Sequence, residues 1–186
     1  DISVEGDYFN TLISLTDKLT DPVVLGSKIM VAEQAGMVWS MGGYFNRWTG
    51  KYGMYGYFKK DNHKFNEVHE VDWLTGMGTV IPTEVIKKIG YWNRDLFPQY
   101  HGDSDFTYRA KKAGYPLEVH PSLKIYNSVK VSGISEKNSL KDVKRLLTDV
   151  RSKSNLRINL RFYSLHATFI LAYFPLFWSC FRLVGG

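Results

Sequence analysis

Two carboxylates stand close together at the predicted start of a short helix, where such a side chain could accept a proton. Asp103 and Asp105 begin this helix, Arg109 lies inside it, and Gly114 is a natural stop at its end. The helix dipole keeps a carboxylate in this place ionised, as a general base must be. The same spacing also fits a purely structural interpretation, with Asp103 as the N-cap and Asp105 paired with Arg109 along the helix.

The elements before this helix must position it, and their sequence is distinctive in combination. The chain reads Asp-Trp-Leu-Thr-Gly-Met-Gly from Asp72 and then predicts a short helix over 83–89 that ends before Gly90. It continues with Phe-Pro-Gln-Tyr-His-Gly-Asp-Ser-Asp-Phe from Phe97 and Arg-Ala-Lys-Lys-Ala-Gly-Tyr from Arg109. This order resembles the acceptor-side half of family 2 glycosyltransferases, in particular their rhamnosyltransferase-like members.

The resemblance implies an α/β domain of the GT-A type with a mixed sheet and C-terminal helices. It implies inverting transfer of a sugar from a nucleoside diphosphate donor to a hydroxyl of a lipid-linked glycan, in bacterial cell-surface polysaccharide synthesis. In the family a carboxylate takes the proton of the acceptor hydroxyl, and here the matching residue is Asp103. Because Gly102 replaces the usual Glu, the choice of base between Asp103 and Asp105 stays open.

The resemblance also implies the acceptor side of the site and a divalent cation, Mg²⁺ or Mn²⁺. The expected acceptor-binding residues come from the two stretches quoted above: Trp73, Thr75, Gly76, His101, Asp105 and Arg109. Asp1 would be the last acid of an Asp-x-Asp metal motif, and Asn127 stands where relatives often carry a further ligand. One terminal Asp cannot hold a cation alone, since such ions need several oxygen ligands.

The expected nucleotide-binding half of the family fold would precede Asp1. We therefore expect a fragment that lacks this half and is inactive in isolation. Two regions are predicted, a partial GT-A catalytic domain over 1–135 and, over 136–186, a basic helix with a nearly apolar tail that associates with membranes.

Composition is that of an ordinary globular protein. The 186 residues are 44% hydrophobic and 23% charged, which argues against disorder. A net charge of +6 favours an anionic partner: a nucleotide-sugar, an anionic membrane surface or nucleic acid. With Cys180 as its single cysteine, the chain forms no intrachain disulfide.

Hydrophobic periodicity predicts alternating helices and strands. A helix is expected over 7–19 and an aromatic, glycine-rich loop or hairpin over 46–64. The predicted strands lie at 23–31, 37–45, 68–81 and, as one or two short strands, 117–126. The first is expected to be buried and interrupted at Gly26, and Gly42-Gly43 in the second marks a turn or a close backbone approach.

The C-terminal third changes character. Asn138 and Ser139 can cap a basic amphipathic helix that reaches Val150, and 162–181 then contains no Asp, Glu, Lys or Arg. As one helix, these twenty residues would extend about 30 Å, the thickness of a bilayer core. The segment fits a membrane span, an interfacial helix, a re-entrant pair bent at Pro175, or a helix docked on the core. Basic residues before it would face the headgroups at the cytoplasmic side of the inner membrane.

Two other functions remain open. A basic, aromatic module could bind single-stranded nucleic acid through the Tyr44–Phe58 loop and the helix after Ser139. That hypothesis explains the charge but not the Gly-Asp-Ser-Asp helix, so no nucleic-acid partner is expected. A membrane-bound adaptor that has kept the acceptor half without catalysis is the third hypothesis.

Overall fold

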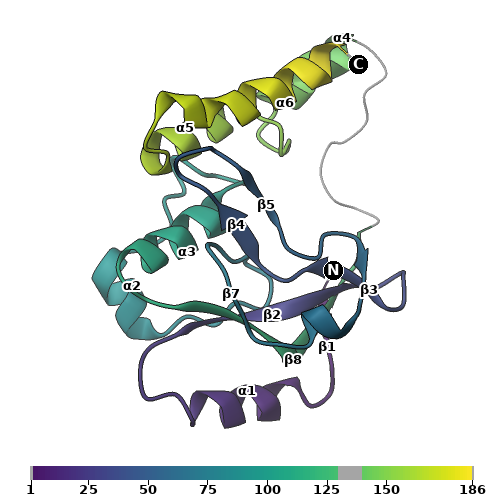
Figure 1. The fold of residues 1–186 in the computed structure, drawn as a ribbon, viewed down its shortest axis with the longest axis vertical. Coiled ribbons are helices and arrows are strands. Elements are labelled where there is room, and N and C mark those ends of the chain that lie inside the picture. The colour runs from purple at the N-terminus through teal and green to yellow at the C-terminus, as the bar shows by residue number, and fades with distance from the viewer. Residues whose placement is uncertain (1, 130–139, 186) are drawn as a thin grey trace. The chain divides into compact units, whose positions relative to one another are not determined.

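The computed structural model describes residues 2–129 and 140–185 (Figure 1). These residues form two compact units, each built from stretches that are separated in sequence. The first unit draws on Asp1–Tyr44, Gly53–Tyr91 and Phe106–Val131, and the second on Phe45–Tyr52, Trp92–Asp105 and Ser132–Gly186. Helices alternate with strands of a mixed sheet along the chain, which confirms the predicted α/β class.

A mixed sheet forms the centre of the first unit. Its strands follow the spatial order β1 (Ile2–Val4), β8 (Leu117–Asn127), β2 (Val24–Val31), β3 (Met37–Ser40) and β6 (Lys59–Lys60), and β7 (His69–Glu70) also pairs with β8. Strands β2 and β8 run parallel, whereas β1, β3, β6 and β7 join the sheet antiparallel. Every residue of β2 is buried, which confirms the buried strand predicted at 23–31, but the strand continues through Gly26, where an interruption was expected.

Helices cover both faces of this sheet (Figure 1). Helix α1 (Tyr8–Thr16), shorter than the predicted 7–19, packs Tyr8 against Ile29, Leu123 and Ile125. On the other face, α2 (Thr83–Ile89) and the part of α3 (Gly102–Lys112) that belongs to this unit contribute Val85 and Ala110 to a second core cluster. The predicted helix at 83–89 is confirmed.

The predicted strand at 68–81 is wrong, whereas the predicted strand at 37–45 divides at Gly42-Gly43, where the sequence indicates a turn or a close backbone approach. The expected strand at 37–45 breaks at Gly42, whose φ of 76° is unfavourable for other residues, and β4 (Gly43–Phe45) then pairs with β5 (Tyr52–Met54) in a separate two-stranded sheet. The expected strand at 68–81 contains only β7. Beyond it the Thr79 hydroxyl donates to the Thr75 carbonyl, and Gly78 has a φ of 63°.

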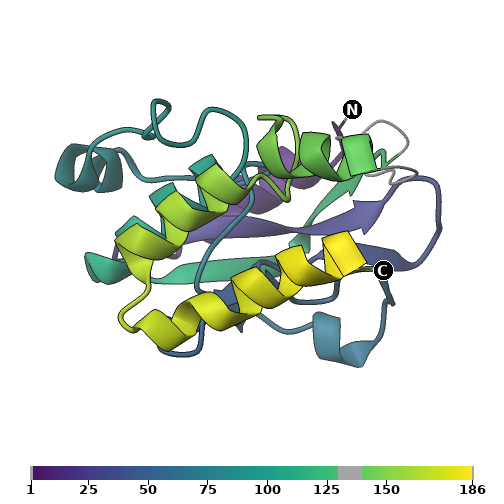
Figure 2. The same cartoon turned by 90° about the horizontal axis from the view of Figure 1, so that it is seen from above.

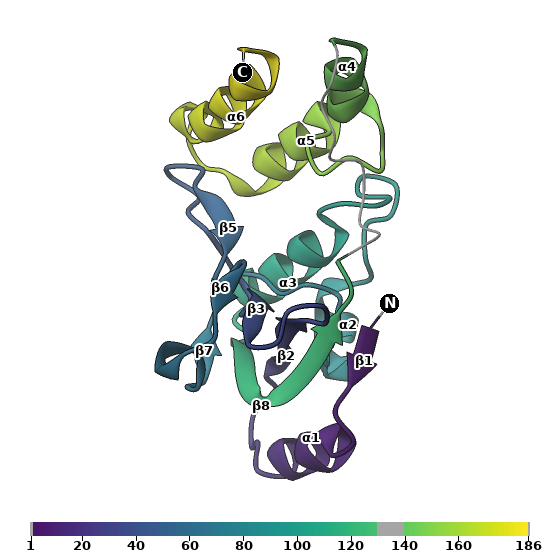
Figure 3. The ribbon, with the colours of Figure 1, turned by 90° about the vertical axis from the view of Figure 1, so that its right-hand side faces the viewer.

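Short elements complete the first unit and helices dominate the second. The 3₁₀ helix η1 (His63–Phe65) follows β6. The second unit contains α4 (Leu140–Thr148), α5 (Leu156–His166), the 3₁₀ helix η2 (Ile170–Tyr173) and α6 (Phe174–Gly185). The chain reverses direction between α5 and α6 (Figure 2), and α4 packs against both of them (Figure 3). The predicted cap residues of α4, Asn138 and Ser139, lie outside the described residues.

The single helix considered for 162–181 is wrong. Helix α5 ends at His166, and extended backbone at Ala167 and Phe169 separates it from η2 and α6. Polar bonds to the β4–β5 loop hold this break: the Thr168 amide donates to the Arg47 carbonyl, and Arg47 Nε donates to the Thr168 hydroxyl at 2.7 Å. Among the described residues, no helix combines the length and apolar character that crossing a bilayer requires.

The predicted bend at Pro175 is also wrong. Pro175 is the second residue of α6, within the first turn, where proline costs no helical hydrogen bond.

The loop 46–51 packs closely against the break at 167–169, because the Tyr163 hydroxyl donates to the Gly50 carbonyl at 2.6 Å. A side chain on Gly50 would collide with the Ala172 carbonyl, and its φ of 70° also favours glycine.

Candidate active site

Helix α3 starts two residues earlier than a cap at Asp103 would require. The Asp105 amide donates to the His101 carbonyl at 2.8 Å, so His101 takes the N-cap place and Asp103 lies in the first turn. The predicted cap at Asp103 is therefore wrong, while the predicted acidic first turn is confirmed. Asp103 is exposed, whereas Ser104 and Asp105 are buried. The helix start thus presents one carboxylate to solvent and encloses the other.

The buried carboxylate of this helix pairs with the C-terminal region. Asp105 Oδ1 lies 2.8 Å from His166 Nε2 on α5, and the two side chains are only 2% and 1% exposed. A pair this short and this buried fixes both side chains, since breaking it would leave a polar group in an apolar surrounding. His166 therefore ties the first turn of α3 to α5 within the second unit.

His101 forms a second tie between the same two helices. Its ring stacks on Phe162 of α5, with centroids 4.3 Å apart and an interplanar angle of 18°. The ring nitrogens lie 3.1 Å from the Ser104 hydroxyl and 3.1 Å from Asn159 Oδ1. Because the Asn159 amide nitrogen donates elsewhere, to the carbonyls of Lys153 and Asn155, His101 donates from Nε2 to Asn159 and accepts from Ser104 at Nδ1.

Burial sets the protonation of this network. It lowers the pKa of His101 from the ordinary 6.5 to about 4, although the hydrogen bond to Asn159 opposes the change. Burial also raises the pKa of Tyr52 well above 10, and that of Tyr163 to about 12. At neutral pH the His101 ring is therefore an uncharged support, and the two tyrosines remain protonated.

The other predicted site residues belong to the first unit. Trp73 is only 5% exposed: its ring covers Gly43, where an added Cβ would collide with it, and its indole nitrogen donates to the Tyr44 carbonyl. Thr75 and Gly76 lie in the turn after Trp73, with Gly76 exposed. Arg109 donates to the carbonyls of Ile89 and Tyr91 at 2.8 and 2.9 Å, and so secures the end of α2. An acceptor-binding role for these four residues stays a prediction.

Of the two expected metal ligands, only Asn127 lies among the described residues. Asn127 is 9% exposed at the end of β8, where its backbone carbonyl accepts from the Ala32 amide. Asp1 lies outside the described residues. Within 2–129 and 140–185 there is no group of three His, Cys, Asp or Glu side chains placed to hold a metal ion. The divalent cation therefore rests on the resemblance alone.

Sequence reasoning missed the supporting residues on α5. His166 and Asn159 are separated from Asp105 by more than fifty residues, and no local spacing links them. One signal was present, because His166 lies four residues after Phe162 and so shares its helix face.

Neither the protein-family models nor the curated proteins compared with this chain match it. Its function must be inferred from the sequence pattern and the geometry.

Proposed function

We propose that this chain is the acceptor side of an inverting family 2 glycosyltransferase of the GT-A type, with Asp103 as its general base. The observation that carries the proposal is the start of α3, where an exposed carboxylate stands directly beside side chains locked by burial. A base in a transfer reaction must be accessible to substrate and yet held in one position. Asp103 meets both requirements, whereas the buried and paired Asp105 lacks the accessibility.

In the proposed reaction, the Asp103 carboxylate takes the proton from an acceptor hydroxyl. The acceptor oxygen forms a bond to the anomeric carbon of the donor sugar, and the bond from that carbon to the diphosphate oxygen breaks on the opposite face. The nucleoside diphosphate leaves with the bonding electron pair, and the anomeric configuration is inverted. A divalent cation would neutralise the leaving diphosphate, as the resemblance implies. The role derived for this chain is proton removal by Asp103.

The supporting side chains have a separate role in the proposal. The Asp105–His166 pair and the stacking of His101 on Phe162 fix the first turn of α3. Small displacements of a catalytic group cost large factors in rate, so such support contributes to catalysis without touching substrate. Asp105, His101 and His166 are therefore positioning residues.

We also propose that the protein works at the cytoplasmic face of the inner membrane, on a lipid-linked glycan. The supporting feature is an exposed aromatic face on α6, where the rings of Phe174, Trp178 and Phe181 stack in succession. Each of the three is more than half exposed, and the preceding Ile170 is 83% exposed. Large exposed apolar groups in one place are typical of surfaces that contact protein or lipid.

The nucleic-acid hypothesis receives less support from the aromatic loop. Phe45 and Tyr52 contact the Phe162 ring inside the second unit, so neither ring is presented for base stacking. Trp48 is exposed, but its ring contacts the ring of Phe169, the residue just before η2. Salt-dependent binding of single-stranded RNA with no response to nucleotide-sugars would favour that hypothesis over glycosyl transfer.

Sugar transfer by the full-length protein tests the proposal. Nucleotide-sugars would be offered with a membrane extract as the source of acceptor, and products followed by mass spectrometry. Asp103→Asn should lower the turnover about 10³-fold, because the base is lost while the side-chain shape is kept. The control is Asp95→Asn, the same change at an almost fully exposed residue of the same unit. Near-normal turnover in Asp103→Asn would contradict the assignment.

A further inference from the structure

A groove in the second unit is not used by the proposed chemistry. It has a volume of about 1060 Å³ and lies between α4, α5 and the η2 segment. Much of its wall is apolar, supplied by the side chains of Val143, Leu147, Leu156, Leu160 and Tyr173. A cavity of this size accommodates a ligand as large as a typical cofactor.

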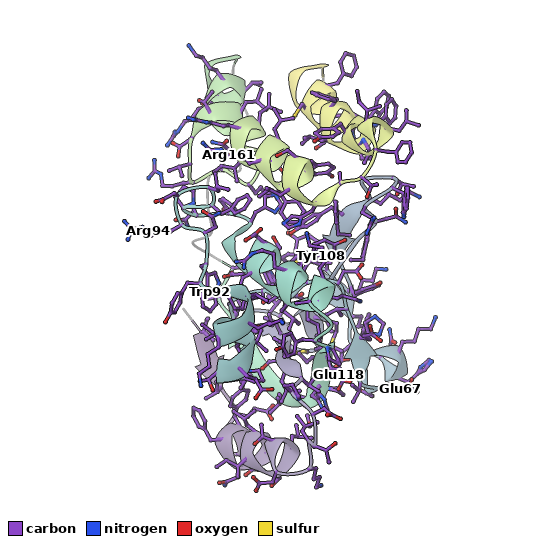
Figure 4. The ribbon with its side chains drawn as sticks, turned by 90° about the vertical axis from the view of Figure 1, so that its left-hand side faces the viewer. Glu67, Trp92, Arg94, Tyr108, Glu118 and Arg161 are labelled. Carbon is purple, nitrogen blue, oxygen red and sulfur yellow. The ribbon has the colours of Figure 1, made fainter. Side chains whose placement is uncertain are left out.

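Three cations border this apolar groove. Lys144 comes from α4, while Arg157 and Arg161 lie one turn apart on α5 (Arg161 is labelled in Figure 4). Arg161 is oriented by a hydrogen bond to the Leu96 carbonyl at 3.2 Å. Among the described residues that line the groove there is no Asp or Glu. An apolar channel with a cationic border complements an apolar chain that carries phosphate.

Helix α5 connects the groove with the candidate base. Its Phe162 and His166 contact the residues around the start of α3, while Arg157, Leu160 and Arg161 line the groove. Since residues three and four apart share a face of a helix, these two sets occupy different faces of α5. One rigid element therefore carries both the support for Asp103 and the wall of the groove.

We propose that this groove binds the phosphorylated lipid that carries the acceptor glycan, with its apolar chain between α4 and α5 and its phosphate against Lys144, Arg157 and Arg161. The inference rests on the proposed function, which it deepens by assigning the lipid part of the acceptor to a place in the fold. A lipid seated there keeps the attached glycan in the unit that contains Asp103.

Binding of farnesyl diphosphate to the full chain tests this inference, measured by calorimetry below the concentration at which the lipid forms micelles. Inorganic diphosphate and farnesol are the partial ligands. Farnesyl diphosphate should bind at least about 10-fold more tightly than either, because both the apolar wall and the cations contribute. Equal affinity for inorganic diphosphate would overturn the proposal by showing only an anion site.

Charge-reversal variants test whether farnesyl diphosphate binds in the groove. Arg157→Glu should weaken farnesyl diphosphate binding about 10-fold or more, and Lys144→Glu should act similarly. Both residues are exposed, and an acid in the first turn of α5 suits the helix dipole, so the fold should persist. Lys153→Glu is the matched control, an exposed cation of the same unit outside the groove lining, and should change affinity less than about 2-fold. An equal loss in Lys153→Glu would overturn the assignment.

Membrane headgroups are the competing source of phosphate. Vesicles with one-third phosphatidylglycerol should bind Arg157→Glu within about 2-fold of the unaltered chain, because one rim charge contributes little at a lipid surface. If Arg157→Glu lost vesicle binding while the unaltered chain bound no farnesyl diphosphate, the cations would form a surface for lipid headgroups, and the proposal would be overturned. These assays need no turnover, so their failure is separate from a failure of Asp103→Asn to abolish transfer.

Discussion

Each unit of the molecule buries a polar cluster, and the two clusters are built differently. In the first unit, the Lys28 ammonium, 1% exposed, lies 2.8 Å from Asp61 and also donates to the Phe65 carbonyl and to Asn66. In the second unit, Asp105 pairs with His166, and His101 bonds to Ser104 and Asn159. The first cluster joins a central strand to the segment after β6, whereas the second encloses the start of a helix that presents an exposed carboxylate.

This difference distinguishes a buried cluster that only stabilises the fold from one that supports a candidate functional site. The Lys28 partners are a carboxylate, an amide and a backbone carbonyl around one cation, an arrangement that satisfies the ammonium and leaves no reactive group at its centre. Around Asp103 the locked side chains are those of the next two residues in sequence, Ser104 and Asp105. Only the second arrangement combines immobility with an accessible acid or base.

The largest effect expected on stability concerns the first cluster. Asp61→Ala leaves the Lys28 ammonium buried without its anion and should lower the free energy of unfolding by about 3 kcal/mol. Urea denaturation followed by circular dichroism measures the loss. The double variant Lys28→Met, Asp61→Ala removes the charge as well and should regain part of the stability. A single variant as stable as the unaltered chain would show that the two buried clusters are not comparable.

A smaller effect, dependent on pH, sharpens the comparison for the second cluster. Because the pKa of His101 is about 4 in the folded chain and near 6.5 when unfolded, the unfolded state takes up a proton first as the pH falls. Stability should therefore decrease by about 2.5 kcal/mol between pH 6.5 and pH 4 on account of this ring. Urea midpoints across this range measure it.

His101→Asn is the control for this pH effect, because the charges of His166 and Asp105 also act on the ring and the variant keeps both of them. Asn removes the ionisable group and tolerates the φ of 64° at this position. The difference between the two pH profiles isolates the His101 contribution. Parallel profiles would contradict the inferred burial of a neutral ring.

The smallest expected effect concerns the exposed aromatic face of the second unit. Trp178→Ser should weaken binding to vesicles containing phosphatidylglycerol about 10-fold, because an interfacial ring is lost from α6. Co-sedimentation with the vesicles measures it. Trp92→Ser makes the same change at a less exposed tryptophan of this unit, 39% against 54%, and should leave binding near normal. Equal effects at both positions would remove α6 from the membrane proposal.

Local sequence signals predict much of the first unit. Neighbouring residues predict the buried strand β2, the limits of α2 at Pro82 and Gly90, and the start and end of α3. The structure confirms these bounds within one or two positions, except that β2 continues through Gly26. The predicted strand at 68–81 fails because the turn there depends on a bond between Thr79 and Thr75 and on close packing of Gly78 against Ser27. Apolar patterning does not register such contacts.

The supporting part of the candidate site could not be predicted from local patterns. Asp103 and Asp105 attract attention as acids at a helix start, but which of them is buried depends on His166, distant in sequence. The tail was misjudged for the same reason, since its break at 167–169 is held by Arg47 of a remote loop. Both errors arise from long-range polar contacts, which only the folded chain brings together.

The central claim is that the buried pair of Asp105 and His166 holds the helix that presents Asp103. The most direct test is the kcat of sugar transfer by His166→Ala in the full-length protein, at a temperature where circular dichroism shows the fold intact. We predict that kcat falls about 10- to 100-fold with an unchanged donor KM, and that His166→Gln, which can still donate to Asp105, regains most of the rate. A kcat equal to that of the unaltered protein in a folded His166→Ala variant would contradict the account.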